Sequence, residues 1–147
     1  MSGMTSQLAN FAADLSYEDL PAEVIERTKL LIFDITGIMV RARHDAESTA
    51  SMISAVERLG LASGDCSVIG DTRAYAPTAA ALVNGTLAHS LDFDDTHAAG
   101  SLHSSAPIVP AALAAAEMAG SPGRALNAAR TVGPEVQIRL ALALRPS

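Results

Sequence analysis

Three features of this sequence predict an all-α fold of five or six helices. Apolar residues recur at intervals of three and four along most of the chain, as they do on one face of a helix. Alanine supplies much of the 49% apolar content and aromatic residues only 3%, so helices can pack closely with small side chains between them. Alternation of apolar and polar residues, which indicates half-buried strands, is nearly absent.

The first half of the chain predicts three helices. Apolar spacing indicates a short helix over residues 4–15 and a second from Pro21 to about Arg43, since proline suits the first turn of a helix. Gly37 costs this second helix about 1 kcal/mol against alanine, which indicates that another element packs closely there. A third helix is expected over residues 46–60, ended by Gly60.

The second half predicts a loop and then three more helices. Residues 61–77 are rich in breakers and predict a loop with a very short strand over residues 67–69. Helices are expected over 77–91, from Ser104 or Ser105 to Ala119, and over about 124–144, with an irregular segment over 92–103. Ser104 should cap the fifth helix, and Gly133-Pro134 should kink or restart the last one.

Composition argues against several classes of partner. The net charge is -6, and the ten basic residues form no cluster, so neither nucleic acid nor an anionic membrane surface is an expected partner. No apolar run approaches the roughly 20 residues of a membrane span. The single cysteine, Cys66, cannot form an internal disulfide, which suits the cytoplasm.

One polar region stands out from the helical background. Three of the four histidines and three aspartates lie between His89 and His103. A helix extending to about Leu91 would place His89 and Asp92 on one face.

This region has three interpretations. It could be helix capping by Asp94, Asp95 and Ser104, with solvated histidines. It could be acid/base chemistry, in which a carboxylate and a histidine move a proton on a bound substrate. It could also be a metal site, as in a metal-dependent hydrolase, although no spacing matches a specific motif; the candidate ligands are His89, Asp92, Asp95, His97 and His103.

The order of motifs in this region resembles the MmgE/PrpD family, whose members include 2-methylcitrate dehydratase, cis-aconitate decarboxylase and iminodisuccinate epimerase. The motifs are Asn84-Gly85, Ala88-His89, Leu91-Asp92-Phe93-Asp94-Asp95-Thr96, His103-Ser104-Ser105 and Val109-Pro110-Ala111-Ala112-Leu113-Ala114.

The resemblance implies a fold and a chemistry. The family has a large helical domain and a smaller α/β lid domain, with the active site between them. Its reactions begin at a carbon next to a carboxylate, where a base removes a proton and the carbanion then expels a group or is reprotonated. We therefore expect a lyase acting on a small di- or tricarboxylic acid, first a 2-methylcitrate dehydratase, with an iminodisuccinate-epimerase-like isomerase as an alternative. No cofactor and no metal are expected, and the protein is expected to be a homodimer.

The resemblance also implies roles for single residues. Asp92 and His103 are the expected catalytic residues, Asp92 in orientation or proton transfer and His103 as general acid/base. Thr96 is expected to donate a hydrogen bond to a substrate carboxylate. Asp95, His89 and His97 are expected to line or support the substrate site.

The chain departs from the family in length and in charge. We expect residues 1–147 to form one N-terminal helical domain of a truncated enzyme without the lid, because the family continues for several hundred residues that carry a second histidine and active-site lysines. The one lysine, Lys29, falls within the apolar pattern of the second helix, and no arginine lies between Arg73 and Arg124. The expected site is thus short of cations, and a non-catalytic helical association module remains an alternative function.

Overall fold

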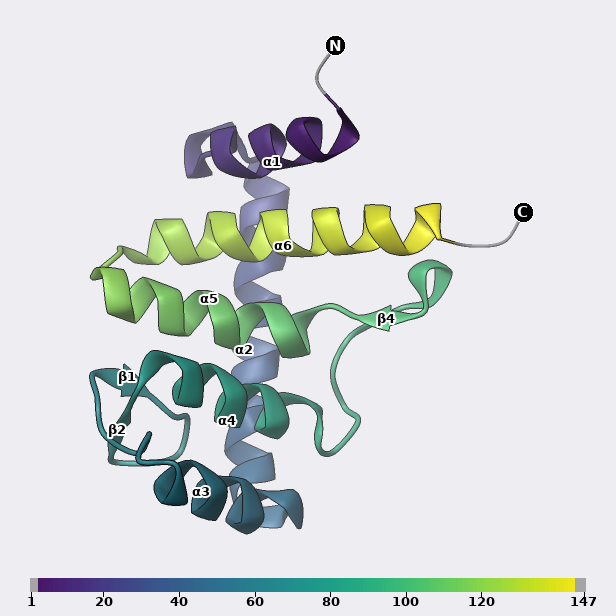
Figure 1. Ribbon diagram of the computed structural model, residues 1–147. Coiled ribbons are helices and arrows are strands. Elements are labelled where there is room, and N and C mark those ends of the chain that lie inside the picture. The colour runs from purple at the N-terminus through teal and green to yellow at the C-terminus, as the bar shows by residue number, and fades with distance from the viewer. Residues whose placement is uncertain (1–2, 145–147) are drawn as a thin grey trace.

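The fold is a stack of helices arranged along one long helix. A computed structural model describes residues 3–144. Helix α2 (Ala22–Asp45) runs the length of the molecule. Figure 1 shows the other helices stacked across it. Along α2 their order is α3 (Ser48–Arg58), α4 (Pro77–His89), α5 (Ser105–Ala119), α6 (Gly123–Ala143) and α1 (Met4–Asp14). The all-α prediction is confirmed.

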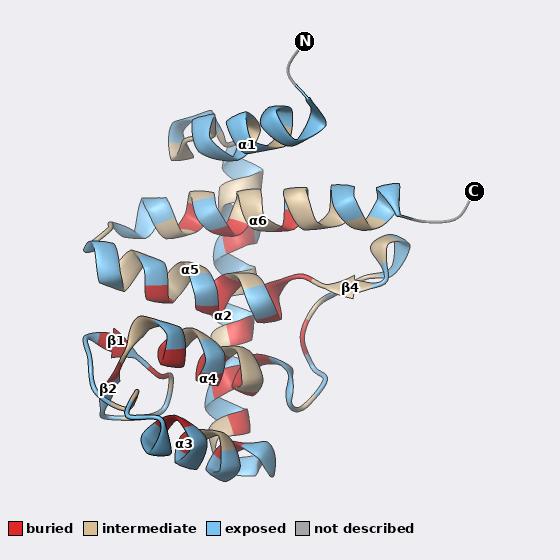
Figure 2. Cartoon of the chain, viewed as in Figure 1, coloured by how far each residue is buried: buried red, intermediate tan, exposed pale blue. Residues whose placement is uncertain are grey.

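The core forms where α2 crosses the helices stacked on it. Ile35, Ile38, Met39 and Ala42 are buried at helical spacing along one face of α2. They belong to one cluster with apolar residues of α3, α4 and α5, and Figure 2 shows the buried segments of these helices facing inward. Full burial of one such aliphatic side chain stabilises the fold by about 1.5–3 kcal/mol, so the packing at this crossing holds the stacked helices on α2.

Glycines lie where α4, α5 and α6 pack together. A Cβ added to Gly85 of α4 would lie 3.7 Å from the carbonyl oxygen of Ala106 in α5, an ordinary contact distance. A Cβ at Gly133 of α6 would lie 2.6 Å from Cγ2 of Ile108, inside normal contact distance. The expected restart at Pro134 does not occur, since α6 runs through it as one helix.

Short strands and turns complete the chain. Strand β1 (Cys66–Ser67) pairs antiparallel with β2 (Ala74–Tyr75), so the strand expected over residues 67–69 lies further toward the N-terminus. The buried amide of Asn84 in α4 holds this loop: its Oδ1 accepts from the backbone N–H of Ile69 at 2.8 Å, and its Nδ2 donates to the carbonyl of Ser67 at 2.9 Å. The remaining pieces are η1 (Tyr17–Asp19), β3 (Thr96–His97), η2 (Ala98–Gly100) and β4 (Leu102–His103).

Two expectations about α2 are wrong. Gly37 is exposed, and a Cβ there would meet nothing within 4 Å, so no element packs on it within the described chain. Leu30, Phe33 and Val40 are exposed around it. Lys29 is not part of the buried face either; its Nζ lies 2.7 Å from a Glu26 carboxylate oxygen at the surface. No helix within residues 3–144 is both long and apolar enough to cross a membrane.

Candidate active site

The site begins where α4 ends. The helix stops at His89, before the Leu91 expected from the sequence, and the chain turns at Asp92, whose φ is +55°. Aspartate is one of the few residues that enter this left-handed region readily. His89 and Asp92 therefore do not share a helix face as expected. The turn still brings Asp92 close to His89, since its backbone N–H donates to the His89 carbonyl at 3.0 Å.

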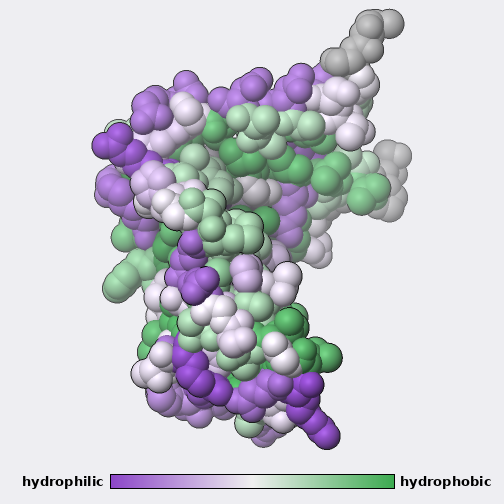
Figure 3. All heavy atoms as spheres, turned by 60° about the vertical axis from the view of Figure 1, so that its left-hand side comes forward, coloured by the Kyte–Doolittle hydropathy of each residue, from purple (hydrophilic) through white to green (hydrophobic). Residues whose placement is uncertain are grey.

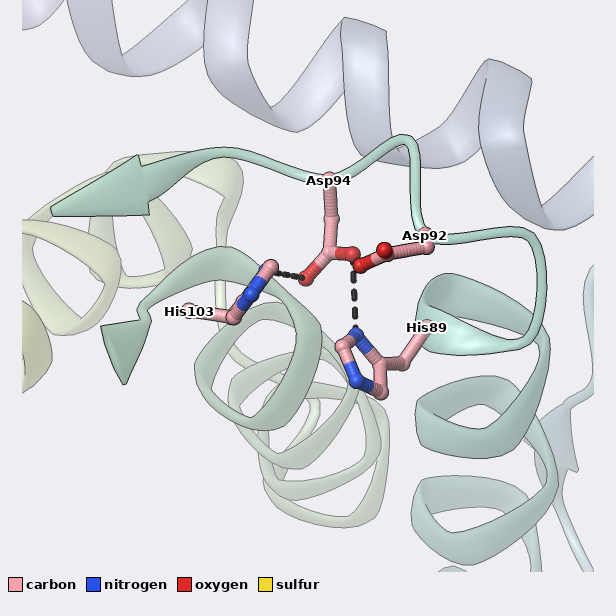
Figure 4. Close-up of side chains that lie close together, drawn as sticks. All are labelled: His89, Asp92, Asp94 and His103. Carbon is pink, nitrogen blue, oxygen red and sulfur yellow. Dashed lines mark hydrogen bonds and ion pairs between the residues drawn. The ribbon is translucent and has the colours of Figure 1, made fainter. Parts of the chain in front are cut away.

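Asp94 is the centre of the cluster. Its side chain is 0% exposed, and each of its carboxylate oxygens meets a different histidine. His89 Nδ1 lies 2.9 Å from Oδ1, and His103 Nδ1 lies 3.1 Å from Oδ2. The two rings meet edge to face with centroids 4.8 Å apart. Figure 4 shows His89 and His103 converging on Asp94 from α4 and from the β3–β4 hairpin, with Asp92 beside them.

This bridge determines how the two imidazoles are protonated. An ionised carboxylate can only accept hydrogen bonds, so both Nδ1 atoms carry hydrogen and act as donors. In each neutral ring Nε2 is then the nitrogen that can accept a proton. Asp92 is exposed, and its carboxylate makes no hydrogen bond within residues 3–144. The cluster thus combines two oriented imidazoles and one unengaged carboxylate, which suits proton transfer.

An apolar groove leads to the two histidines. It lies between α4 and α5, has a volume of about 580 Å³ and includes His89 and His103 in its lining. Most of the rest of the lining is small or apolar, including Leu82, Gly85 and Pro107. Apolar walls with a few convergent polar groups are typical of small-molecule sites.

The β3–β4 hairpin separates the remaining expected residues from this cluster. His97 turns into its own loop, where Nδ1 accepts from the backbone N–H of Gly100 at 2.9 Å. Thr96 pairs with His103 across the hairpin and is exposed at the edge of a second cavity. The structure therefore brings His89, Asp92 and His103 together, with Thr96 one strand away and His97 outside the cluster.

Asp95 caps the start of helix α5. Its Oδ1 accepts from the backbone N–H of Ser105 at 3.0 Å. Ser104, the expected cap, has helical backbone angles and makes no capping bond with its side chain. The capping interpretation is thus confirmed for Asp95 and wrong for Ser104. The other Asp95 oxygen lies 3.7 Å from Nη2 of Arg130 in α6.

Four side chains of the cluster could also hold a metal ion. His89, Asp92, Asp94 and His103 each offer a ligand atom, and the four atoms lie within 4.8 Å of one another. The Nδ1 atoms of both histidines already contact Asp94, so an ion bound through either Nδ1 would have to replace that hydrogen bond. Asp95 and His97, which the metal interpretation included, are not part of this group.

Sequence reasoning missed two residues of the site. Asp94 was assigned to helix capping, and no local pattern shows that the turn at Asp92 folds it back between two histidines. Arg130 lies 25 residues from Ser105, yet its Nη2 donates to the Ser105 hydroxyl at 2.9 Å. The shortage of cations inferred from the sequence is thus partly relieved by α6.

Comparison with known proteins agrees with the motifs. Residues 6–147 match the MmgE/PrpD N-terminal domain. The chain belongs to the MmgE/PrpD family. A cis-aconitate decarboxylase-like protein of Aspergillus oryzae is 38% identical over 117 residues, covering 78% of this chain and 23% of that protein.

Two further relatives are named cis-aconitate decarboxylase. The cis-aconitate decarboxylase of Aspergillus terreus is 34% identical over 128 residues, covering 86% of this chain and 25% of the relative. The human cis-aconitate decarboxylase is 36% identical over 148 residues, covering 95% of this chain and 30% of the relative. This MmgE/PrpD chain therefore spans between about a quarter and a third of the length of these curated relatives.

Proposed function

We propose that the chain carries proton-transfer residues of a lyase acting on a small di- or tricarboxylic acid next to one of its carboxylates. The observation that carries this proposal is the buried Asp94 carboxylate shared by His89 and His103 at the end of an apolar groove. The names of the relatives favour decarboxylation of cis-aconitate. Dehydration of 2-methylcitrate, the first expectation from the sequence, is the competing outcome.

The arrangement suggests how the proton moves. In a decarboxylation the bond between a carboxylate carbon and its neighbour breaks, carbon dioxide leaves, and the electron pair stays on the remaining carbon. A histidine then protonates that carbon, and we assign this step to His103. In a dehydration Asp92 would remove the proton next to the carboxylate, and His103 would protonate the departing hydroxide. Positioned acid/base groups typically contribute about 10²–10⁴-fold to rate.

The test is turnover of cis-aconitate, 2-methylcitrate and iminodisuccinate by the purified chain in heavy water, followed by NMR. We expect a product deuterated at the reacting carbon, and loss of about 100-fold or more in His103→Gln. His44→Gln is the matched control, because His44 is the exposed histidine outside the site. No product and no deuterium exchange with any of the three acids would rule out catalysis by this chain.

Association is the second candidate function, and one observation favours it. Phe33 is 80% exposed on α2, between Leu30 and Val40, which are also exposed, and Gly37 leaves space for a close approach. The face in Figure 3 likewise shows apolar patches between hydrophilic ones. We propose that the protein forms a homodimer, with α2 contributing to the contact. Light scattering tests this: a monomer at high concentration would refute it, and Phe33→Asp should weaken a dimer while Asp34→Asn should not.

A further inference from the structure

Arg130 is a buried cation with few partners. Its side chain is 7% exposed, and its one hydrogen bond within the described residues runs from Nη2 to Ser105 Oγ. The same nitrogen lies 3.7 Å from Asp95, whereas Nε is buried without a partner. A guanidinium has five N–H donors, and one of them makes a hydrogen bond within the described residues. Burial lowers the pKa of Arg130; the Asp95 charge opposes this effect, and the positive charge of Arg27 adds to it.

A second cavity adjoins this cation. It has a volume of about 530 Å³ and is lined by parts of α2, α6 and the β3–β4 hairpin, with Arg27 and Arg130 both in its wall. Arg27 is exposed and has no ion-pair partner within residues 3–144. Thr28 and Thr131 also line the cavity, with their hydroxyl oxygens 3.2 Å apart. Two guanidinium groups near hydroxyls form a surface suited to an anion.

The acids in the same wall do not all compete for these arginines. Glu135 accepts from Arg139 at 3.0 Å, outside the cavity lining. Asp95 Oδ1 accepts from the first backbone N–H of α5, and its Oδ2 lies 3.7 Å from Arg130 Nη2. Glu23 is the lining acid without an ion pair in the described part of the chain. The wall therefore holds Arg27 and Arg130 against Asp95 and the unpaired Glu23, and Arg27 is the arginine of the two that no acid pairs with in the described chain.

The cavity lies close to the reacting histidine. Thr96 is in its lining and is the cross-strand partner of His103, and Ser104, the residue after His103, also lines it. Directly paired residues of antiparallel strands have Cβ atoms about 4.5–5.5 Å apart. Thr96 thus links this cavity to the strand that carries His103.

We propose that Arg27 and Arg130 form a carboxylate-binding subsite which, with Thr96, holds a substrate carboxylate remote from the bond that reacts. This inference rests on the proposed function, because it assigns the substrate's second charged group. It also supplies cations that the sequence lacks near the Asp/His region. Arg27 comes from α2 and Arg130 from α6, so no local motif contains either.

The test is calorimetric titration with tricarballylate, a saturated tricarboxylate, at constant ionic strength. Arg27→Gln should weaken binding about 3–5-fold, the effect of one exposed charge. Arg130→Lys keeps the charge but loses the planar guanidinium group, which can donate two hydrogen bonds to one carboxylate, and should weaken binding about 10-fold. Arg41→Gln is the matched control, since Arg41 is an exposed arginine on the same helix paired with Asp45. Circular dichroism checks that each variant is folded.

Inorganic phosphate is titrated in parallel. The subsite is supported if phosphate binds more weakly than tricarballylate, and if Arg27→Gln weakens tricarballylate binding while Arg41→Gln does not. Equal affinity of Arg27→Gln and wild type for tricarballylate would overturn it, as would phosphate binding as tightly as the tricarboxylate. Arg27-dependent binding without turnover in heavy water would leave the subsite standing and refute the proposed function. Turnover with an unchanged KM in Arg27→Gln would refute the subsite alone.

Discussion

Asp94→Asn replaces one oxygen of a buried carboxylate by an amide nitrogen with almost no change in shape. Asp94 accepts from His89 at 2.9 Å and from His103 at 3.1 Å. An asparagine oxygen can accept from one of these rings, while its amide N–H groups face the other. That second ring must move its hydrogen from Nδ1 to Nε2 or lose its hydrogen bond. The substitution should therefore change the tautomer of one histidine.

The expected cost follows from the exposure of the two rings. A hydrogen bond to a charged group is worth about 1.5–3 kcal/mol. The His89 side chain is 54% exposed, so water can replace much of its bond, whereas that of His103 is 33% exposed. We expect Asp94→Asn to lower the free energy of unfolding by about 1–3 kcal/mol. The urea midpoint should then fall by roughly 1 M, since small domains have m-values of about 1–3 kcal/mol/M.

Two measurements check this prediction. Urea unfolding followed by circular dichroism gives the stability, and long-range ¹H–¹⁵N NMR of the imidazoles gives the tautomers. Asp65→Asn is the control, because Asp65 is an exposed loop aspartate and should change neither. A wild-type protein in which either histidine carries its hydrogen on Nε2 alone would refute the bridging role of Asp94. So would an Asp94→Asn variant as stable as wild type.

Two further predictions concern stability away from the site. Hydrogen bonds from Arg73 hold the pKa of Asp71 well below its usual range. Because that pKa is lowered in the folded state, its stabilisation is present above the unfolded pKa of about 3.9 and is lost as the pH falls through the folded value. Asp71→Asn should therefore lower the free energy of unfolding by about 1–2 kcal/mol at pH 7, a figure reduced because Arg73 is half-exposed. In urea titrations the difference in stability between wild type and variant should become smaller below about pH 4. A difference that stays constant down to pH 2 would contradict this prediction. Gly37→Ala should raise the free energy of unfolding by about 0.5–1 kcal/mol, because the new methyl group meets nothing. At Gly133 the new Cβ would meet Ile108 at 2.6 Å, so the free energy of unfolding of Gly133→Ala should be about 1–2 kcal/mol lower than that of Gly37→Ala. Thermal melts compare the two variants, and equal melting temperatures would contradict the packing at Gly133.

Local rules account for most of the secondary structure. Helix bounds depend on periodicity, proline and glycine, which act over a few residues, and the expected helices are found with shifts of a few residues. Pro134 is an exception. Gly133 lets α6 pack against Ile108, and this tertiary contact favours one continuous helix over a restart.

Gly37 shows what local rules cannot decide. A glycine within a helix permits a close neighbour, but the sequence does not show whether another element packs against it. Among the glycines of the described α-helices the close approach is at Gly133, whereas a Cβ at Gly85 would make an ordinary contact and Gly37 faces solvent.

The sequence by itself determined the all-α class, the order of the helices and the Asp/His region, because these depend on periodicity and on an ordered set of motifs. Only the tertiary structure decided which side chains of that region meet. The left-handed turn at Asp92 places Asp94 between two histidines, and α6 brings Arg130 to Asp95. Such contacts depend on chain reversal and on helices distant in sequence, and no local pattern of residues specifies either.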